Sequence, residues 1–146
     1  MDIIAGLQNK NHTEAYQLLL ELEGRSAESN ECYGYFEAFL TLLESKSSFV
    51  RTRGFRLICA QAQWDVENKM EKNLDVLLSM LEDEKPTAVR QCLAALHQVV
   101  LYQPHLIEKI EEKLKTMDLS KYKDSMYKDS MRPLIEKDME ALRKIM

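Results

Sequence analysis

The sequence predicts an all-α protein, a short right-handed α-solenoid of antiparallel helical hairpins. Three observations support this prediction. Apolar residues recur every three or four positions along most of the 146 residues, which is the period of a helix that buries one face. Only four glycines and three prolines occur, too few for the many tight turns of a β-sandwich or barrel. Finally, an apolar helix followed by a polar turn and Val-Arg occurs twice, at Val50 and at Val89.

In the first half of the chain, each expected helix is bounded by a residue type that favours a helix end. Polar side chains cap N-termini by accepting backbone N–H groups, and glycine ends helices because it adopts left-handed dihedral angles readily. The expected helices are Thr13–Glu23 with Gly24 as the C-cap, the segment from Asn30 to Leu43, 49–62 with Ser47 or Ser48 as the N-cap, and Val66–Leu81 with Asp65 as the N-cap.

The second half continues with the same helical period. Proline suits the first turn of a helix, because its missing N–H would have no partner there. The expected helices, which bring the total to seven or eight, are Ala88–Tyr102 with Thr87 as the N-cap, a helix that starts at Pro104 and buries Leu106 to Leu114, and a last helix from about Ser130 to Ile145.

An internal repeat organises these helices. Residues 42–58 align with residues 81–97 when the chain is shifted by 39 positions, since Val50-Arg51 then falls on Val89-Arg90. A period near 40 residues with two helices per unit is typical of an α-solenoid, whose units stack side by side. The polar turn of 83–88 is then the elbow within one hairpin, and Val89 points into the core.

These stretches resemble HEAT repeats, close relatives of armadillo repeats, in a small bacterial-type HEAT-like protein. LEDEKPTAVRQCLAALHQVV carries the resemblance most strongly, LLESKSSFVRTRGFRLICAQA comes second, and Met131-Arg132 occupies the Val-Arg place once more. The resemblance implies one repeat domain over 1–146, with units at about 30–64 and 65–103 between partial or capping helices. It also implies that Arg51 and Arg90 bond to groups at neighbouring elbows, with Asp83 or Glu84 as candidate partners.

Two departures from the regular pattern stand out. Gly54 interrupts the second helix of the first unit, where it either permits a close approach of helices or weakens the helix by up to about 1 kcal/mol. Residues 122–131 contain the pentapeptide YKDSM twice in tandem. We interpret this repeat as an accidental duplication within a tolerant connection before the last helix.

Composition indicates a cytoplasmic protein. The three cysteines, Cys32, Cys59 and Cys92, form no CxxC motif, and their odd number does not suit a disulfide framework. The sequence shows no signal-peptide pattern and no apolar run of bilayer length. The net charge is −4, yet residues 45–64 carry four basic side chains and no acid.

No catalytic, metal or cofactor site is predicted. His12, His97 and His105 are scattered without the spacing of a metal site. The glycine-rich loops that bind phosphates are missing, and no cysteine or serine has a recognisable base. We therefore expect a protein that is not an enzyme and binds no cofactor.

The basic stretch supplies the candidate contact surface. Arg53 and Arg56 lie three residues apart on one helical face, Gln63 continues that face, and Trp64 follows. Cations beside an aromatic side chain are frequent in protein interfaces, so we expect these four residues to bind a partner, with an acidic protein segment as the ligand. One alternative is a solvated face with Trp64 partly buried between units. The anion that compensates the arginines could also come from the chain itself, from Glu14, Glu21, Glu23 or the acids of 65–75.

Three classes of function follow from the sequence. The first is a scaffold that binds another protein along the surface of its second helices, as solenoids commonly do. The second class, the alternative to a scaffold, is a nucleic-acid-binding protein related to HEAT-like DNA glycosylases. The chain is acidic, however, and lacks a matching catalytic constellation. An enzyme is the third, supported only by the number of carboxylates. The sequence indicates neither the identity of the partner nor the oligomeric state.

Overall fold

The structure is a computed structural model that describes residues 2–122 and 131–146. All regular secondary structure within these two ranges is helical, and they contain no β-strand. This confirms the all-α prediction. Among the helices of these ranges, none combines the length and the apolar character needed to cross a bilayer.

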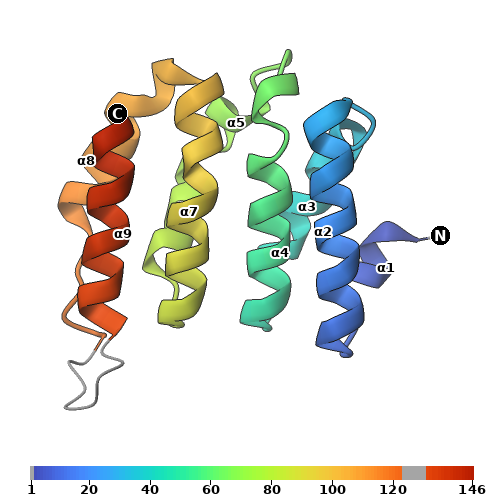
Figure 1. The fold of residues 1–146 in the computed structure, drawn as a ribbon, viewed down its shortest axis with the longest axis horizontal. Helices are drawn as coiled ribbons and strands as arrows, with labels where there is room; N and C mark the ends of the chain where they lie inside the picture. Colours follow the sequence, from blue (N-terminus) through green and yellow to red (C-terminus); the bar gives the residue numbers. More distant parts are fainter. Residues whose placement is uncertain (1, 123–130) are drawn as a thin grey trace.

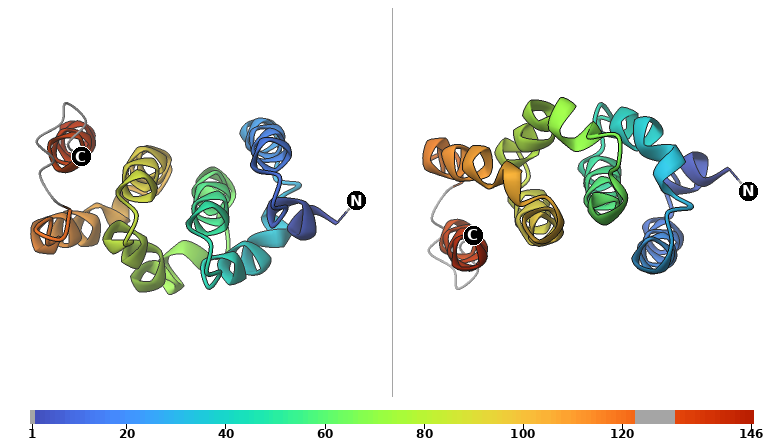
Figure 2. Two further views of the ribbon diagram at one scale, coloured as in Figure 1. Left: turned by 90° about the horizontal axis from the view of Figure 1, so that it is seen from below. Right: turned by 90° about the horizontal axis from the view of Figure 1, so that it is seen from above.

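The helices lie in two rows (Figures 1 and 2). We call them the inner row and the outer row. The inner row consists of α2 (His12–Glu28), α4 (Ser48–Cys59), α7 (Pro86–Tyr102) and α9 (Met131–Ile145). The outer row consists of α1 (Ile3–Leu7), α3 (Phe36–Leu42), α5 (Lys69–Lys72), α6 (Leu74–Ser79) and α8 (Ile107–Thr116). Four 3-10 turns complete the described structure: η1 (Tyr33–Tyr35), η2 (Ala62–Trp64), η3 (Met80–Glu82) and η4 (Pro104–Leu106).

The helices of the inner row form one continuous layer (Figure 1). Its helices pack in chain order, α2 on α4, α4 on α7, and α7 on α9. They all begin at the same end of the molecule, the lower end in Figure 1. Seen along the helices in Figure 2, the row is curved, with α2 and α9 standing forward of α4 and α7. The exposed side of the inner row is therefore concave.

The hydrophobic core lies between the two rows. Val50, Leu57, Val89, Leu93 and Leu96 are each at most 6% exposed, which confirms that the repeat pattern identifies core positions. The three cysteines are also buried and free. Burial raises the pKa of the Cys59 and Cys92 thiols, so both behave as small apolar side chains in this core.

Helix ends agree with the sequence only in part. The Ser47 side chain accepts the N–H of Val50 and caps α4, as predicted. The prediction that Gly24 ends the preceding helix is wrong, because α2 continues to Glu28. Ser26 is fully buried one turn after Leu22, so packing extends the helix past the glycine. Thr87 is not the N-cap of α7 either, because this helix begins at Pro86. The Asp83 carboxylate accepts the N–H of Lys85 and so holds the backbone just before the helix.

Residues 66–81 do not form the single helix expected from their period. They divide into α5, α6 and η3, and Val66 is 85% exposed. The Asp65 carboxylate accepts the N–H groups of Lys69 and Met70, at 2.8 and 2.9 Å. It therefore caps the N-terminus of α5, although it does not adjoin this helix in the sequence. Asn68 makes this turn possible with a left-handed backbone (φ 56°), a conformation that asparagine tolerates well.

The short helix α1 was not expected from the sequence. It is held by the Asp2 side chain, which accepts the N–H of Ala5. The duplicated pentapeptide lies outside the described residues except for its first and last residue, Tyr122 and Met131. Tyr122 is buried, and its hydroxyl donates to the backbone carbonyl of Asp83.

Candidate partner-binding face

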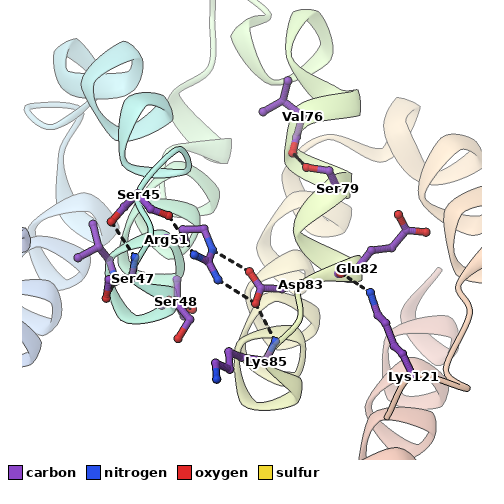
Figure 3. Close-up of polar contacts among 12 residues, drawn as sticks. Ser45, Ser47, Ser48, Arg51, Val76, Ser79, Glu82, Asp83, Lys85 and Lys121 are labelled. Atoms are coloured by element: carbon purple, nitrogen blue, oxygen red, sulfur yellow. Dashed lines mark hydrogen bonds and ion pairs between the residues drawn. The ribbon is translucent and has the colours of Figure 1, made fainter.

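The elbow arginine Arg51 is occupied within the fold (Figure 3). Its Nε and Nη2 donate to the two carboxylate oxygens of Asp83, at 2.8 and 3.1 Å, and its Nη1 donates to the Ser45 carbonyl at 2.9 Å. The bond to Asp83 raises the pKa of the guanidinium. Of the two candidate partners, Asp83 is therefore the one that bonds to Arg51.

The equivalent arginines of the other units also bond within the fold. Arg90 donates from Nε to the carboxylate of Asp138 on α9, at 2.7 Å. Arg132 donates to the backbone carbonyls of Leu119 and Tyr122, in the connection that precedes α9. Arg51 and Arg90 therefore link helices far apart in the sequence, whereas Arg132 bonds to the connection that precedes its own helix.

Arg56, a candidate contact residue, is paired inside the molecule. It forms a two-pronged ion pair with Glu23 of α2, with N–O distances of 3.1 and 2.7 Å. Burial lowers its pKa and the bond to Glu23 raises it, with a net increase. Its guanidinium also lies 5.7 Å from the centre of the Tyr16 ring and donates to Gln91. Glu23 thus supplies the internal anion that was one of the two alternatives for this patch.

Arg53 differs from Arg56, because it is a buried cation with neutral partners. The side chain is 96% removed from solvent, at 4% relative exposure. It donates to the Leu7 carbonyl at 2.8 Å and contacts Nδ1 of His12 at 2.9 Å. Since a guanidinium offers only donors, Nδ1 accepts, and the imidazole proton lies on Nε2. Burial lowers the pKa of Arg53, and within the described part of the chain it forms no ion pair.

Gln63 and Trp64 hold η2 against the end of α2. The indole N–H of Trp64 donates to the Ser26 carbonyl at 2.6 Å, and the Gln63 amide donates to the same oxygen at 3.2 Å. Both side chains are partly buried. The structure therefore brings all four candidate residues to the contact between α4–η2 and the α1–α2 pair. It does not gather them into one exposed patch.

A hollow of about 680 Å³ opens where α2, α4 and α7 begin, and we call it the N-terminal hollow. Each of the three helices contributes side chains from its first turns. Its lining includes His12, Tyr16, Phe49, Arg53, Lys85 and Gln91. Phe49 stacks on His12 with a centroid distance of 4.1 Å, which forms a continuous aromatic edge from α2 to α4.

Two smaller hollows continue this surface along α7. One, of about 320 Å³, lies between Glu23, Arg56 and Gln98, and the other, of about 330 Å³, lies between α7 and Asp138 of α9. Gln91 and Ala94 line both, and Gln91 also lines the N-terminal hollow. The concave face thus carries a chain of depressions whose floor is α7, where small side chains leave room.

Sequence reasoning missed Tyr16, Phe49 and Gln91. Phe49 begins the helix expected over 49–62 and is 57% exposed. The repeat itself held the useful signal, since a shift of 39 residues places Arg53 on Cys92, a fully buried residue. The register therefore indicates that Arg53 is buried, whereas helical periodicity within a single unit favoured exposure.

The described residues contain no group of three or more His, Cys, Asp or Glu side chains arranged to hold a metal ion. Among the described residues, His105 Nε2 lies 4.0 Å from the carboxylate of Glu71. Comparison of the chain with protein-family models, curated proteins and solved structures gave no match.

Proposed function

We propose that this protein is a non-enzymatic interaction module, a short HEAT-like solenoid that binds another protein along its inner row. One observation carries the proposal: three adjoining hollows follow the concave face of α2, α4, α7 and α9, and Gln91 lines all three. A partner that crosses the inner row at α7 would contact neighbouring helical pairs in turn. Solenoids use such extended surfaces to bind chains without needing one deep cleft.

The HEAT-like assignment is supported by the way successive units are joined. The repeat in the sequence corresponds to helical pairs that lie side by side, each with one helix in the outer row and one in the inner row (Figure 2). Arg51 reaches from one unit to the elbow of the next at Asp83, and Arg90 reaches onward to Asp138. Each contact ties neighbouring units together, as the repeat resemblance implies.

Nucleic-acid binding has weaker support. The basic stretch of the sequence does not form a basic surface, since Arg51 and Arg56 pair with carboxylates and Arg53 is buried. Backbone recognition of a duplex needs several exposed cations along one face. The chain as a whole carries a net charge of −4.

Site-specific photocrosslinking in the native host tests the proposal. A photoreactive benzoylphenylalanine replaces Ala94, which is exposed on the inner row and lines two of the hollows. In the matched control it replaces Val76, which is 52% exposed on α6 of the outer row. We expect one discrete protein adduct from position 94 and none of the same mass from position 76.

The adduct is then identified, and its purified protein is titrated against two arginine variants. Ala94→Arg fills the floor of the hollows and should abolish binding, whereas Val76→Arg should leave the affinity unchanged. Adducts formed only from position 76 would contradict binding by the inner row. An adduct that nuclease digestion removes would favour the nucleic-acid alternative.

A further inference from the structure

The N-terminal hollow presents unusually exposed aromatic surface. Tyr16 is 48% exposed and Phe49 is 57% exposed, and both line this hollow from neighbouring helices. Aromatic side chains gain most from burial against a partner, because each removes a large apolar area from water. This wall suits an apolar side chain of a bound segment.

The charged residues that line the hollow are basic. Arg53 and Lys85 line it, and no Asp or Glu occurs among the described residues of its lining. Arg53 is 4% exposed and has only neutral hydrogen-bond partners, the Leu7 carbonyl and His12. A buried charge without a counter-ion is costly, so an anion in the hollow would stabilise it.

The surrounding backbone favours an anion as well. Residues at the start of three helices line the hollow, where the helix dipole is positive. The first turns of α2 and α4 are capped by Asn11 and Ser47, whereas α7 has no side-chain cap at Lys85. Donors at this site include the Nε2–H of His12, the Lys85 ammonium and the side-chain NH2 of Gln91, beside hydroxyl groups that donate or accept.

We propose that the N-terminal hollow binds an acidic peptide segment of the partner protein. A carboxylate of that segment faces Arg53 and Lys85, and a neighbouring apolar side chain packs against Tyr16 and Phe49. This inference rests on the proposed function and adds to it the position of the anchor and the chemistry of the ligand.

A peptide fits the charges better than a nucleic acid does. Beyond the N-terminal hollow the concave face is balanced, because Arg56 pairs with Glu23 and Arg90 pairs with Asp138. A polyanion with a charge at every residue would meet these carboxylates, whereas one or two acids in an otherwise neutral segment would not. The local charge therefore matches a short acidic sequence.

Selection from a random peptide library tests the inference without knowledge of the partner. The full chain is immobilised, and a displayed library of 12-residue peptides is selected at about 50 mM NaCl, where exposed charges are little screened. We expect the selected peptides to be enriched in Asp or Glu next to a large apolar residue. A fluorescein-labelled 12-base single-stranded DNA serves as the competing probe.

Two charge-reversed variants locate the binding site. Lys85→Glu changes an exposed side chain of the hollow, and Lys115→Glu makes the same change on α8 in the outer row, where Lys115 is also exposed. We expect Lys85→Glu to lower the affinity for a selected peptide by about tenfold or more, which corresponds to about 1.4 kcal/mol. Lys115→Glu should change this affinity by less than about twofold. Phe49→Ala should weaken the same peptide without altering its salt dependence.

Three results would overturn the inference. The first is a selection that yields no peptides, or peptides with no excess of acids. The second is equal affinity in both lysine variants. The third is an oligonucleotide that displaces the peptide at lower concentration than unlabelled peptide does. If position 94 still crosslinks to a protein in any of these cases, the interaction module stands and only its acidic ligand is wrong.

Discussion

Replacement of Gly54 by alanine separates two opposite expectations. In an isolated helix the change would stabilise, because alanine is favoured over glycine by about 1 kcal/mol in a helix interior. In the fold, however, Gly54 faces α3. A Cβ at this position would lie 2.8 Å from the Cβ of Leu42 and 2.9 Å from the backbone oxygen of Phe39. The glycine is therefore the point of close approach between α3 and α4.

The sign of the effect follows from what the new methyl group meets. Neither neighbour is the free end of a flexible side chain, so α3 must move away from α4, and Leu42 and Phe39 are both in the core. Overpacking of this kind costs about 1–3 kcal/mol. After subtraction of the gain of about 1 kcal/mol in helix propensity, Gly54→Ala should destabilise by up to about 2 kcal/mol.

Gly24→Ala is the matched control. Gly24 lies within α2, and a Cβ there has no neighbour within 4 Å. This variant should gain stability, by about 0.5–1 kcal/mol. Urea unfolding followed by circular dichroism gives both values under the same conditions, and an unchanged m-value shows that the change in midpoint reports stability.

The order of the two variants decides the matter. Gly54→Ala must be less stable than the wild type while Gly24→Ala is at least as stable. Equal stabilisation by both substitutions would refute the close approach of α3 and α4. It would support instead the other interpretation, in which Gly54 merely weakens its helix.

Three further predictions concern the core, the elbows and alkaline pH. Leu93→Ala removes a side chain with 0% exposure and should cost about 2–5 kcal/mol in the same unfolding assay; a loss below about 0.5 kcal/mol would show that the core register is wrong. Arg51→Ala leaves the Asp83 carboxylate, 4% exposed, without its cation, and should cost more than Arg51→Ala combined with Asp83→Asn; a double variant less stable than the single one would contradict this. Burial, with the nearby charges of Asp83 and Glu82, raises the pKa of Tyr122 from 10.0 to about 12. Between these pH values the folded protein keeps a proton that the unfolded chain has lost. The free energy of unfolding should therefore decrease as the pH rises from 10.0 to about 12, and it should decrease less in the Tyr122→Phe variant.

The sequence predicted the helical class and much of the core because both depend on local period. Leu57 and Leu96 occupy equivalent repeat positions, and both are buried, at 0% and 2% exposure. The elbow contact of Arg51 with Asp83 was also predictable, because the resemblance to HEAT repeats implies that this arginine bonds at a neighbouring elbow. The helical class and the core positions follow from spacing along the chain, whereas the partner of Arg51 came only from the resemblance.

Helix boundaries were less well determined by local signals. Gly24 lies within α2 and Thr87 lies after the start of α7, although both residue types favour helix ends. Packing decided these positions, since Leu22 and Ser26 are buried on either side of Gly24. A propensity of about 1 kcal/mol is small beside the burial of a whole helix face.

The candidate contact residues show what only the tertiary structure decides. By itself, the sequence determined that four cations lie together between residues 45 and 64 without an acid. Their partners come from distant segments: Glu23 for Arg56, Asp83 for Arg51, and the Leu7 carbonyl for Arg53. A charge pattern shows where cations are, but pairing depends on which helices become neighbours. The hollow where α2, α4 and α7 begin, and the exposure of Phe49 at its edge, arise from that packing alone.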